Sequence, residues 1–280
     1  MKKSLELIDW SGYLFRCSSL SHITSTGRGV EITELQKKEL ARLLEKIKLT
    51  EKQALRRDEL LLKMDAKPEL SKGAKTYLEG LWIEETFKRP KEFQNKYTSK
   101  GLEQETESLH LANRVLDWGL DKEYIDGIEF NKNRLSNEYI TGEPDLNSDR
   151  LLADGKSSWN IHTFPHFKED IDPSYYSQGQ GYMWLSGKDS FQLVYCLVDT
   201  PERLILDEIR RQEWASGFIE IPAEMEDDIR NSMTFEDIPE WARVKVYSFE
   251  IDEEYIKKVI ECVEMSRAYL TELNNKIFTK

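Results

Sequence analysis

Residues 141–158 read TGEPDLNSDRLLADGKSS, and this stretch decides the fold. A turn-prone segment separates two short apolar runs, which predicts a β-hairpin. Asp154 and Lys156 are two positions apart on the second strand, so their side chains point to the same face. Asp145 ends the first strand. The hairpin is therefore expected to bring Asp145 beside Asp154.

Outside the hairpin, apolar periodicity predicts alternating strands and helices. Strands are expected over residues 124–130, 138–146, 150–159, 191–199 and 243–251. Helices are expected over residues 31–65, 74–87, 101–118, 174–186, 201–216 and 253–278. This order indicates an α/β fold with a central mixed sheet flanked by helices. We expect a mainly helical N-terminal extension over 1–100 and a core over 101–280, together forming one compact domain.

Composition excludes several classes of protein. No apolar run approaches the roughly 20 residues that span a membrane, and the N-terminus lacks the apolar segment of a signal peptide. We therefore expect a cytoplasmic protein that does not contact membranes. The three cysteines form no CxxC pair and are too few for a four-cysteine iron–sulfur cluster. His162 and His166 flank Pro165, which argues against a helical zinc site.

The charge of the chain is unevenly distributed. The net charge is −12, yet residues 36–100 hold 17 Lys/Arg against 11 Asp/Glu, whereas residues 200–255 hold 6 against 16. A basic face opposite an acidic one is compatible with DNA binding on one side, because phosphate contacts use Lys and Arg. Solvated helix faces would give the same pattern.

Two converging carboxylates with a nearby amine suggest a metal-dependent hydrolytic site. Asp145 and Asp154 would offer hard oxygen ligands suited to Mg²⁺ or Mn²⁺. Lys156 could orient or help to deprotonate an attacking water. An Asp-x-Lys triplet alone is also typical of an exposed strand edge. Its position after a buried-looking Leu-Leu-Ala run favours the site, because an uncompensated buried charge is costly.

A second candidate is Glu105. Positions 102, 105, 109, 112 and 116 share one face of the expected helix, and Glu105 is the acidic member of an otherwise apolar stripe. An acid on a buried face needs a partner such as a metal or a lysine. The alternative is a solvated Glu at the helix start, favoured by the helix dipole.

The third candidate is the pair Gln178 and Tyr182. Their spacing of four residues places both on one helix face. The amide can bind a phosphate and the ring can contact a nucleotide. A polar residue beside a core tyrosine is the alternative interpretation.

In order and spacing, these motifs resemble the PD-(D/E)XK nuclease superfamily, and within it the RecB-like and lambda-exonuclease-like branch. The matching elements are Gly101-x-x-x-Glu105, Gly142-x-x-Asp145, Asp154-x-Lys156 and Gln178-x-x-x-Tyr182. The match covers about residues 101–200. The resemblance implies a restriction-endonuclease-like core in αβββαβ order.

The resemblance also implies roles for particular residues. Divalent metal would be bound by Glu105, Asp145, Asp154 and the carbonyl of Gly155. Lys156 would act on the nucleophilic water, while Gln178 and Tyr182 would position DNA.

Two features depart from the family. Gly155 stands where the family more often has an apolar residue, which predicts a local distortion of the strand. Arg16 and Ser19 only loosely match the N-terminal Arg/Ser segment that binds a terminal 5′-phosphate in lambda-type exonucleases, so they are weaker candidates for substrate binding.

The expected function is a Mg²⁺- or Mn²⁺-dependent exonuclease that acts on double-stranded DNA ends in phage-type recombination. By analogy, a homo-oligomer is expected. Two alternatives stay open: an endonuclease of a restriction or defence system, and an inactive nucleic-acid-binding module with the same fold.

Overall fold

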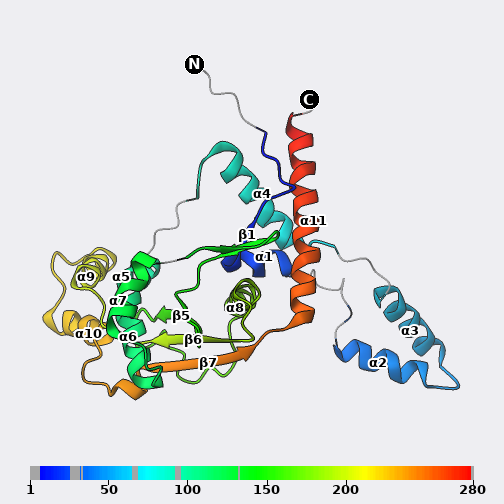
Figure 1. Cartoon of the computed structure of the whole chain (residues 1–280). Coiled ribbons are helices and arrows are strands. Elements are labelled where there is room, and N and C mark those ends of the chain that lie inside the picture. The colour runs from blue at the N-terminus through cyan, green and yellow to red at the C-terminus, as the bar shows by residue number, and fades with distance from the viewer. Residues whose placement is uncertain are drawn as a thin grey trace. The chain divides into compact units, whose positions relative to one another are not determined.

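The computed structural model describes residues 7–25, 32, 34–64, 69–91, 96–131 and 133–278. The chain, drawn in Figure 1, divides into two compact units. Unit 1 comprises Met1–Phe15, Ser19–Pro90 and Glu254–Lys280, and unit 2 comprises Arg16–Ser18 and Lys91–Glu253. The long N-terminal segment of unit 1 thus ends at Pro90, and the unit also includes the last 27 residues of the chain.

Unit 1 is helical. Its helices are α1 (Leu20–Thr24), α2 (Glu34–Leu44), α3 (Glu51–Met64), α4 (Lys72–Phe87) and α11 (Glu253–Phe278). The prediction of one helix over 31–65 is wrong, because a capping box starts a new helix at Thr50. The Thr50 amide donates to Gln53 Oε1 at 3.2 Å, and the Gln53 amide donates to Thr50 Oγ1 at 3.3 Å.

Two packed pairs stabilise this unit. Leu40 and Leu43 of α2 are buried with Leu60 of α3. Trp82 of α4 donates through Nε1 to Asn274 Oδ1 of α11 at 2.6 Å, in a buried contact. The helices predicted over 74–87 and 253–278 are confirmed, and this hydrogen bond fixes them side by side.

Unit 2 contains the mixed sheet. Its strands are β2 (Leu135–Ser136), β3 (Ile140–Gly142), β4 (Leu146–Asn147), β5 (Leu152–Ser157), β6 (Ser190–Cys196) and β7 (Val244–Glu250). The main sheet has the order β4-β5-β6-β7, in which β5 and β6 are parallel and the other pairs antiparallel. A smaller sheet joins β2 and β3 to β1 (Phe15–Arg16).

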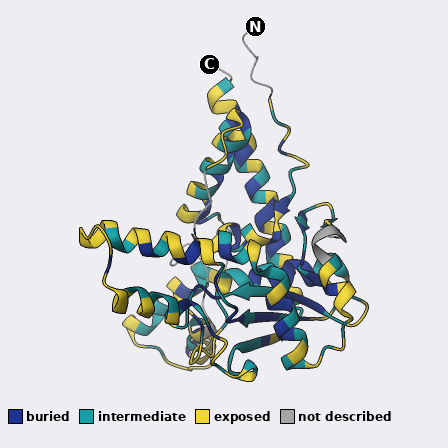
Figure 2. Ribbon diagram, turned by 90° about the vertical axis from the view of Figure 1, so that its left-hand side faces the viewer, coloured by how far each residue is buried: buried dark blue, intermediate teal, exposed yellow. Residues whose placement is uncertain are grey.

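Helices cover both faces of the main sheet. Leu111 of α6 (Glu105–Leu116) is buried with Val194 and Cys196 of β6. On the other face, α8 (Pro173–Ser186) comes so close that a Cβ at Gly179 would lie 2.7 Å from Phe191. Figures 1 and 2 show these layers, with buried residues along the strands. The expected α/β class with a helix-flanked mixed sheet is confirmed.

Three predicted elements of unit 2 differ from the structure. The strand expected over 138–146 is two strands, β3 in the smaller sheet and β4 in the main sheet, so Asp145 precedes β4 and does not end a strand. Residues 124–130 belong to a helix, α7 (Lys122–Asn131), and not to a strand. Its buried Ile125, and an Asp126 carboxylate 2.6 Å from His110 Nε2, pack it against α6. The helix expected over 101–118 is interrupted at Gln104, which separates α5 (Lys96–Glu103) from α6.

The remaining helices of unit 2 are α9 (Glu202–Ser216), which was expected, and α10 (Ala223–Met233), which was not. Trp159, Ile205 and Met233 are buried together between them. Across the described ranges, no helix combines the length and apolar character needed to cross a membrane.

Candidate active site

The hairpin formed by β4 and β5 builds the centre of the site. Leu146 pairs with Ala153, so Asp145 and Asp154, one step further along each strand, become neighbours. The Gly155 amide donates to Asp145 Oδ2 at 2.9 Å. The predicted arrangement of Asp145 beside Asp154 is therefore confirmed.

Gly155 does not distort the strand. Residues 153–157 pair with 192–196 of β6 in unbroken parallel register. A Cβ at Gly155 would lie 3.5 Å from Leu109 Cδ2, an ordinary contact. The predicted local distortion is wrong, because neither the register nor the space around this residue requires glycine.

Asp154 and Lys156 form an ion pair on the α8 face of the sheet. The Asp154 side chain is 3% exposed and that of Lys156 is 24% exposed. Asp154 Oδ2 is buried, and the Lys156 amine is its ion-pair partner. The Lys156 amine also lies 5.0 Å from the centre of the Tyr175 ring. The amine is therefore held close to the carboxylates, and part of the Lys156 side chain reaches solvent.

The site contains more acid than base. Burial raises the pKa of Asp145 well above its usual range, and the charges of Asp154 and Glu105 raise it further. The Lys156 charge and the Gly155 amide oppose this rise in the pKa. Burial lowers the pKa of Lys156, but the charges of Asp154 and Asp145 raise it above its ordinary value. Lys156 is therefore an ammonium that can donate hydrogen bonds but cannot accept a proton at neutral pH.

Glu105 is the first residue of α6 and is half-buried. The positive end of the helix dipole favours an acid there. Its charge acts on Asp145, so the structure brings these two carboxylates within electrostatic reach. The predicted apolar stripe is only partly correct: Leu109 and Ala112 are buried, whereas Leu102 is 72% exposed because it lies on α5.

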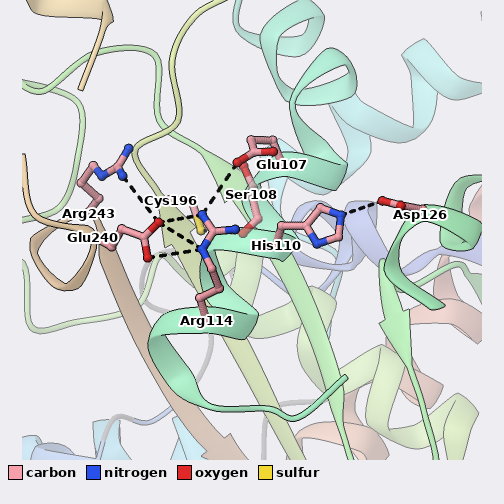
Figure 3. Close-up of polar contacts among 8 residues, drawn as sticks. All are labelled: Glu107, Ser108, His110, Arg114, Asp126, Cys196, Glu240 and Arg243. Carbon is pink, nitrogen blue, oxygen red and sulfur yellow. Dashed lines mark hydrogen bonds and ion pairs between the residues drawn. The ribbon is translucent and has the colours of Figure 1, made fainter. Parts of the chain in front are cut away.

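Contacts along α6 hold it against its surroundings, as Figure 3 shows. Cys196 Sγ of β6 lies 3.3 Å from the Ser108 carbonyl and donates to it. Arg114 donates to both oxygens of Glu240, with a shortest distance of 2.8 Å. These contacts hold the helix that carries Glu105 in one position relative to β6.

Gln178 and Tyr182 lie together on α8. Gln178 Nε2 donates to the Tyr182 hydroxyl at 2.7 Å, and that hydroxyl donates to the Glu143 carbonyl at 3.2 Å. Tyr182 is 5% exposed, and burial raises the pKa of its phenol. Tyr182 therefore supports the chain segment that leads into Asp145, and contact of Tyr182 with DNA stays a prediction. Gln178 is half-buried.

Tyr175 was missed in the sequence. It lies on α8, three residues before Gln178 and seven before Tyr182, so all three share one helix face. Extending the predicted Gln178–Tyr182 face by one turn would have found it. Its ring lies beneath the Lys156 amine and packs edge-on against Tyr195 at 6.1 Å.

Arg16 and Ser19 lie in the N-terminal segment. Arg16 is exposed at the end of β1, and Ser19 is half-buried at the end of a short 3₁₀ helix, Cys17–Ser19. Arg16 belongs to unit 2 and Ser19 to unit 1. Binding of a terminal phosphate by these two residues stays a prediction.

The donor set fits a hard divalent cation. Asp145, Asp154 and Glu105 offer carboxylate oxygens. Burial first, and then the charges of Asp154 and Glu105, raise the pKa of Asp145, and a cation would offset these negative charges. As they stand, however, no three His, Cys, Asp or Glu side chains of the described ranges are arranged to hold a metal ion. The ion pair with Lys156 occupies Asp154 in this arrangement.

Comparison of the whole chain with solved structures gives clear similarities. A phage-related exonuclease from Haemophilus somnus 129PT superimposes with a TM-score of 0.65 and 25% identity, covering 95% of this chain and 97% of that one. An alkaline exonuclease from Laribacter hongkongensis, LHK-Exo, gives a TM-score of 0.48 and 13% identity, covering 96% and 94%. Its complex with dAMP gives 0.42 and 14%, covering 92% and 93%. No protein-family model and no curated protein matches the chain.

Proposed function

We propose that this protein is a divalent-metal-dependent exonuclease of the PD-(D/E)XK type that hydrolyses DNA. The observation that carries the proposal is the hairpin that holds Asp145 and Asp154 together, with Lys156 paired to Asp154. Full-length similarity to the phage-related exonuclease supports the reaction class. Mg²⁺ or Mn²⁺ is the cofactor that the acidic donor set favours.

The metal would be held by Glu105, Asp145, Asp154 and the Gly155 carbonyl. When bound, such an ion lowers the pKa of a water ligand and stabilises charge on a phosphoryl oxygen. Attack by water would form one P–O bond and break the P–O bond to the sugar oxygen of the neighbouring nucleotide. The water would give up a proton to solvent, and the leaving oxygen would take one up from solvent.

Side chains of the protein would orient the attacking water and hold the site together. The Lys156 ammonium donates hydrogen bonds to the water or to a phosphate oxygen, which orients the attack and offsets the growing negative charge. Tyr175 holds that amine from below, and the Gly155 amide holds Asp145. Gln178 is the α8 side chain that we assign to contact with DNA.

The test uses purified protein and three substrates: end-labelled linear duplex, end-labelled single strand and closed circular duplex. With Mg²⁺ or Mn²⁺, an exonuclease releases label from the linear duplex and leaves the closed circle intact, and a chelator stops the reaction. Cutting of the circle would instead show an endonuclease. If the linear duplex stays intact with both metals, the protein is not a nuclease, and the inactive nucleic-acid-binding module is the interpretation that remains.

The duplex-end substrate, the recombination role and assembly into a homo-oligomer belong to the same proposal. A comparison of blunt, 5′-phosphorylated and 5′-hydroxyl ends tests Arg16 and Ser19 as phosphate ligands. Light scattering coupled to gel filtration measures the oligomer, and a mass equal to one 32.9 kDa chain would remove that part of the proposal.

A further inference from the structure

Lys100 of α5 is completely buried, which is rare for a lysine. Its amine donates to the Trp159 carbonyl at 3.2 Å and lies 5.2 Å from the centre of the Phe235 ring. Burial of an amine away from water is costly unless hydrogen bonds compensate it. The Trp159 carbonyl offsets part of this cost, which ties Lys100 to the segment that follows β5.

We call Glu105, Asp145 and Asp154 the acidic cluster. The contact joins the segment that carries Glu105 to the segment that carries Asp154. Trp159 follows β5 directly, and β5 carries Asp154. Lys100 lies on α5, which ends one residue before Gln104 and then continues into α6 at Glu105. Lys100 therefore precedes Glu105 by five residues, and its acceptor Trp159 follows Asp154 by five residues.

Further contacts hold the acceptor still. The Tyr97 ring of α5 packs edge-on against the Trp159 ring at 5.6 Å. Thr200 Oγ1 also donates to the Trp159 carbonyl, at 3.4 Å. The preceding Ser158 amide donates to the Cys196 carbonyl of β6 at 2.9 Å. A displacement of Lys100 would thus move α5 and not Trp159.

We propose that Lys100 is a positioning residue whose buried amine, bound to the Trp159 carbonyl, sets where Glu105 lies relative to Asp145 and Asp154. The proposal rests on the proposed function, because the position of Glu105 matters only if the cluster binds a cation. Lys100 itself touches neither substrate nor metal.

The charge of the amine adjusts this contact. Burial lowers the pKa of Lys100 to about 7, and the charge of Asp199, which follows β6, opposes the fall. Asp199 Oδ1 is fixed by the Phe235 amide at 2.7 Å. On α5 itself, Glu103 pairs with Arg203 of α9. An ammonium binds a carbonyl more strongly than a neutral amine does. The contact therefore weakens as pH rises through about 7.

The experiment compares the parent with Lys100→Met, which removes the donor, and Lys100→Gln, which keeps a donor but cannot titrate. Lys122→Met at the exposed start of α7 is the matched control.

Two readouts are measured: Mn²⁺ affinity by calorimetry without DNA, and kcat and KM for duplex digestion. We expect Lys100→Met to bind Mn²⁺ at least 5-fold more weakly, as about 1 kcal/mol of lost positioning would give. Its kcat should fall about 10-fold or more, with KM within twofold.

Lys100→Gln should recover part of both losses. Its pH profile gives a readout that a purely structural role would not move: the ratio of parent to Lys100→Gln activity should fall as pH rises from 6 to 8. Asp199→Asn, which keeps the oxygen facing the Phe235 amide, should move the midpoint of the parent profile to lower pH.

The outcomes separate the two proposals. A parent that neither binds Mn²⁺ nor cleaves DNA removes the proposed function and the role of Lys100 with it. A parent that does both, with a Lys100→Met variant equal to it in affinity and kcat, overturns the role of Lys100 alone. If Lys100→Met fails to fold, a parent-to-Gln activity ratio that stays constant with pH overturns it equally.

Discussion

Replacement of Lys156 by methionine should strengthen cation binding while it abolishes cleavage. The Lys156 ammonium is paired with Asp154 and acts on Asp145, so it competes with a cation for the same carboxylates. Methionine has a similar length and no charge. The variant therefore removes the competitor and the hydrogen-bond donor together.

The size of the effect follows from Coulomb's law. Unit charges about 4 Å apart interact by about 4 kcal/mol at an effective dielectric constant near 20. Because the Lys156 side chain is 24% exposed, solvent screens part of this interaction. If about one third of this interaction energy survives the screening, Lys156→Met binds Mn²⁺ roughly tenfold more tightly than the parent, since 1.4 kcal/mol corresponds to a factor of ten.

Calorimetric titration of Mn²⁺ into parent and variant without DNA measures the affinity, and end-labelled duplex measures cleavage. Without metal, Lys156→Met leaves a buried carboxylate unpaired and should lose about 2–4 kcal/mol of unfolding free energy, which Mn²⁺ then restores. A variant that binds Mn²⁺ no better than the parent, or that digests DNA at the parental rate, refutes this account of Lys156.

Two further predictions concern stability, both measured by chemical denaturation. A Cβ at Gly142 would lie 2.6 Å from Cys17 Sγ and 2.7 Å from Tyr182 Cε1, so Gly142→Ala should lose about 2–3 kcal/mol, whereas Gly155→Ala should lose less than about 1 kcal/mol. Equal losses would contradict the packing described. Burial and neighbouring acids raise the folded pKa of Asp145 above its ordinary 3.8, so its ionisation costs stability above about pH 4. In chelator, Asp145→Asn should therefore gain stability relative to the parent between pH 4 and pH 7; a difference that is constant with pH would contradict the raised pKa.

Local sequence signals predicted the site better than they predicted its surroundings. The turn residues and the two-residue spacing fix the hairpin, so the placing of Asp145 and Asp154 follows from short-range geometry. The helix over 173–186 was equally readable, because Asp172 caps it and Pro173 starts it.

Tertiary packing decided the structure of the segment that was mispredicted as a strand. The segment YIDGIEF, 124–130, has a strand-like composition, but burial of Ile125 against α6 stabilises it as a helix. The break at Gln104 leaves no strong signal either, since no proline or side-chain cap marks it.

The burial of Lys100 could not be predicted from the sequence. It lies in a basic, polar segment that is typical of a solvated surface. Its acceptor is 59 positions away along the chain, and no local pattern connects the two. Lys156 was recognisable only because the Asp-x-Lys spacing ties it to its partner on the same strand.

The most direct test of the central claim is the Mg²⁺-dependent release of label from a linear duplex by the parent and by Asp154→Asn. Asparagine keeps the shape of the side chain and removes the charge that pairs with Lys156 and would bind the metal. The account predicts at least a 100-fold fall in the rate of the variant, equivalent to about 2.7 kcal/mol, while Lys122→Met digests DNA as the parent does. An Asp154→Asn variant that releases label at the parental rate would show that phosphodiester hydrolysis takes place elsewhere in the chain.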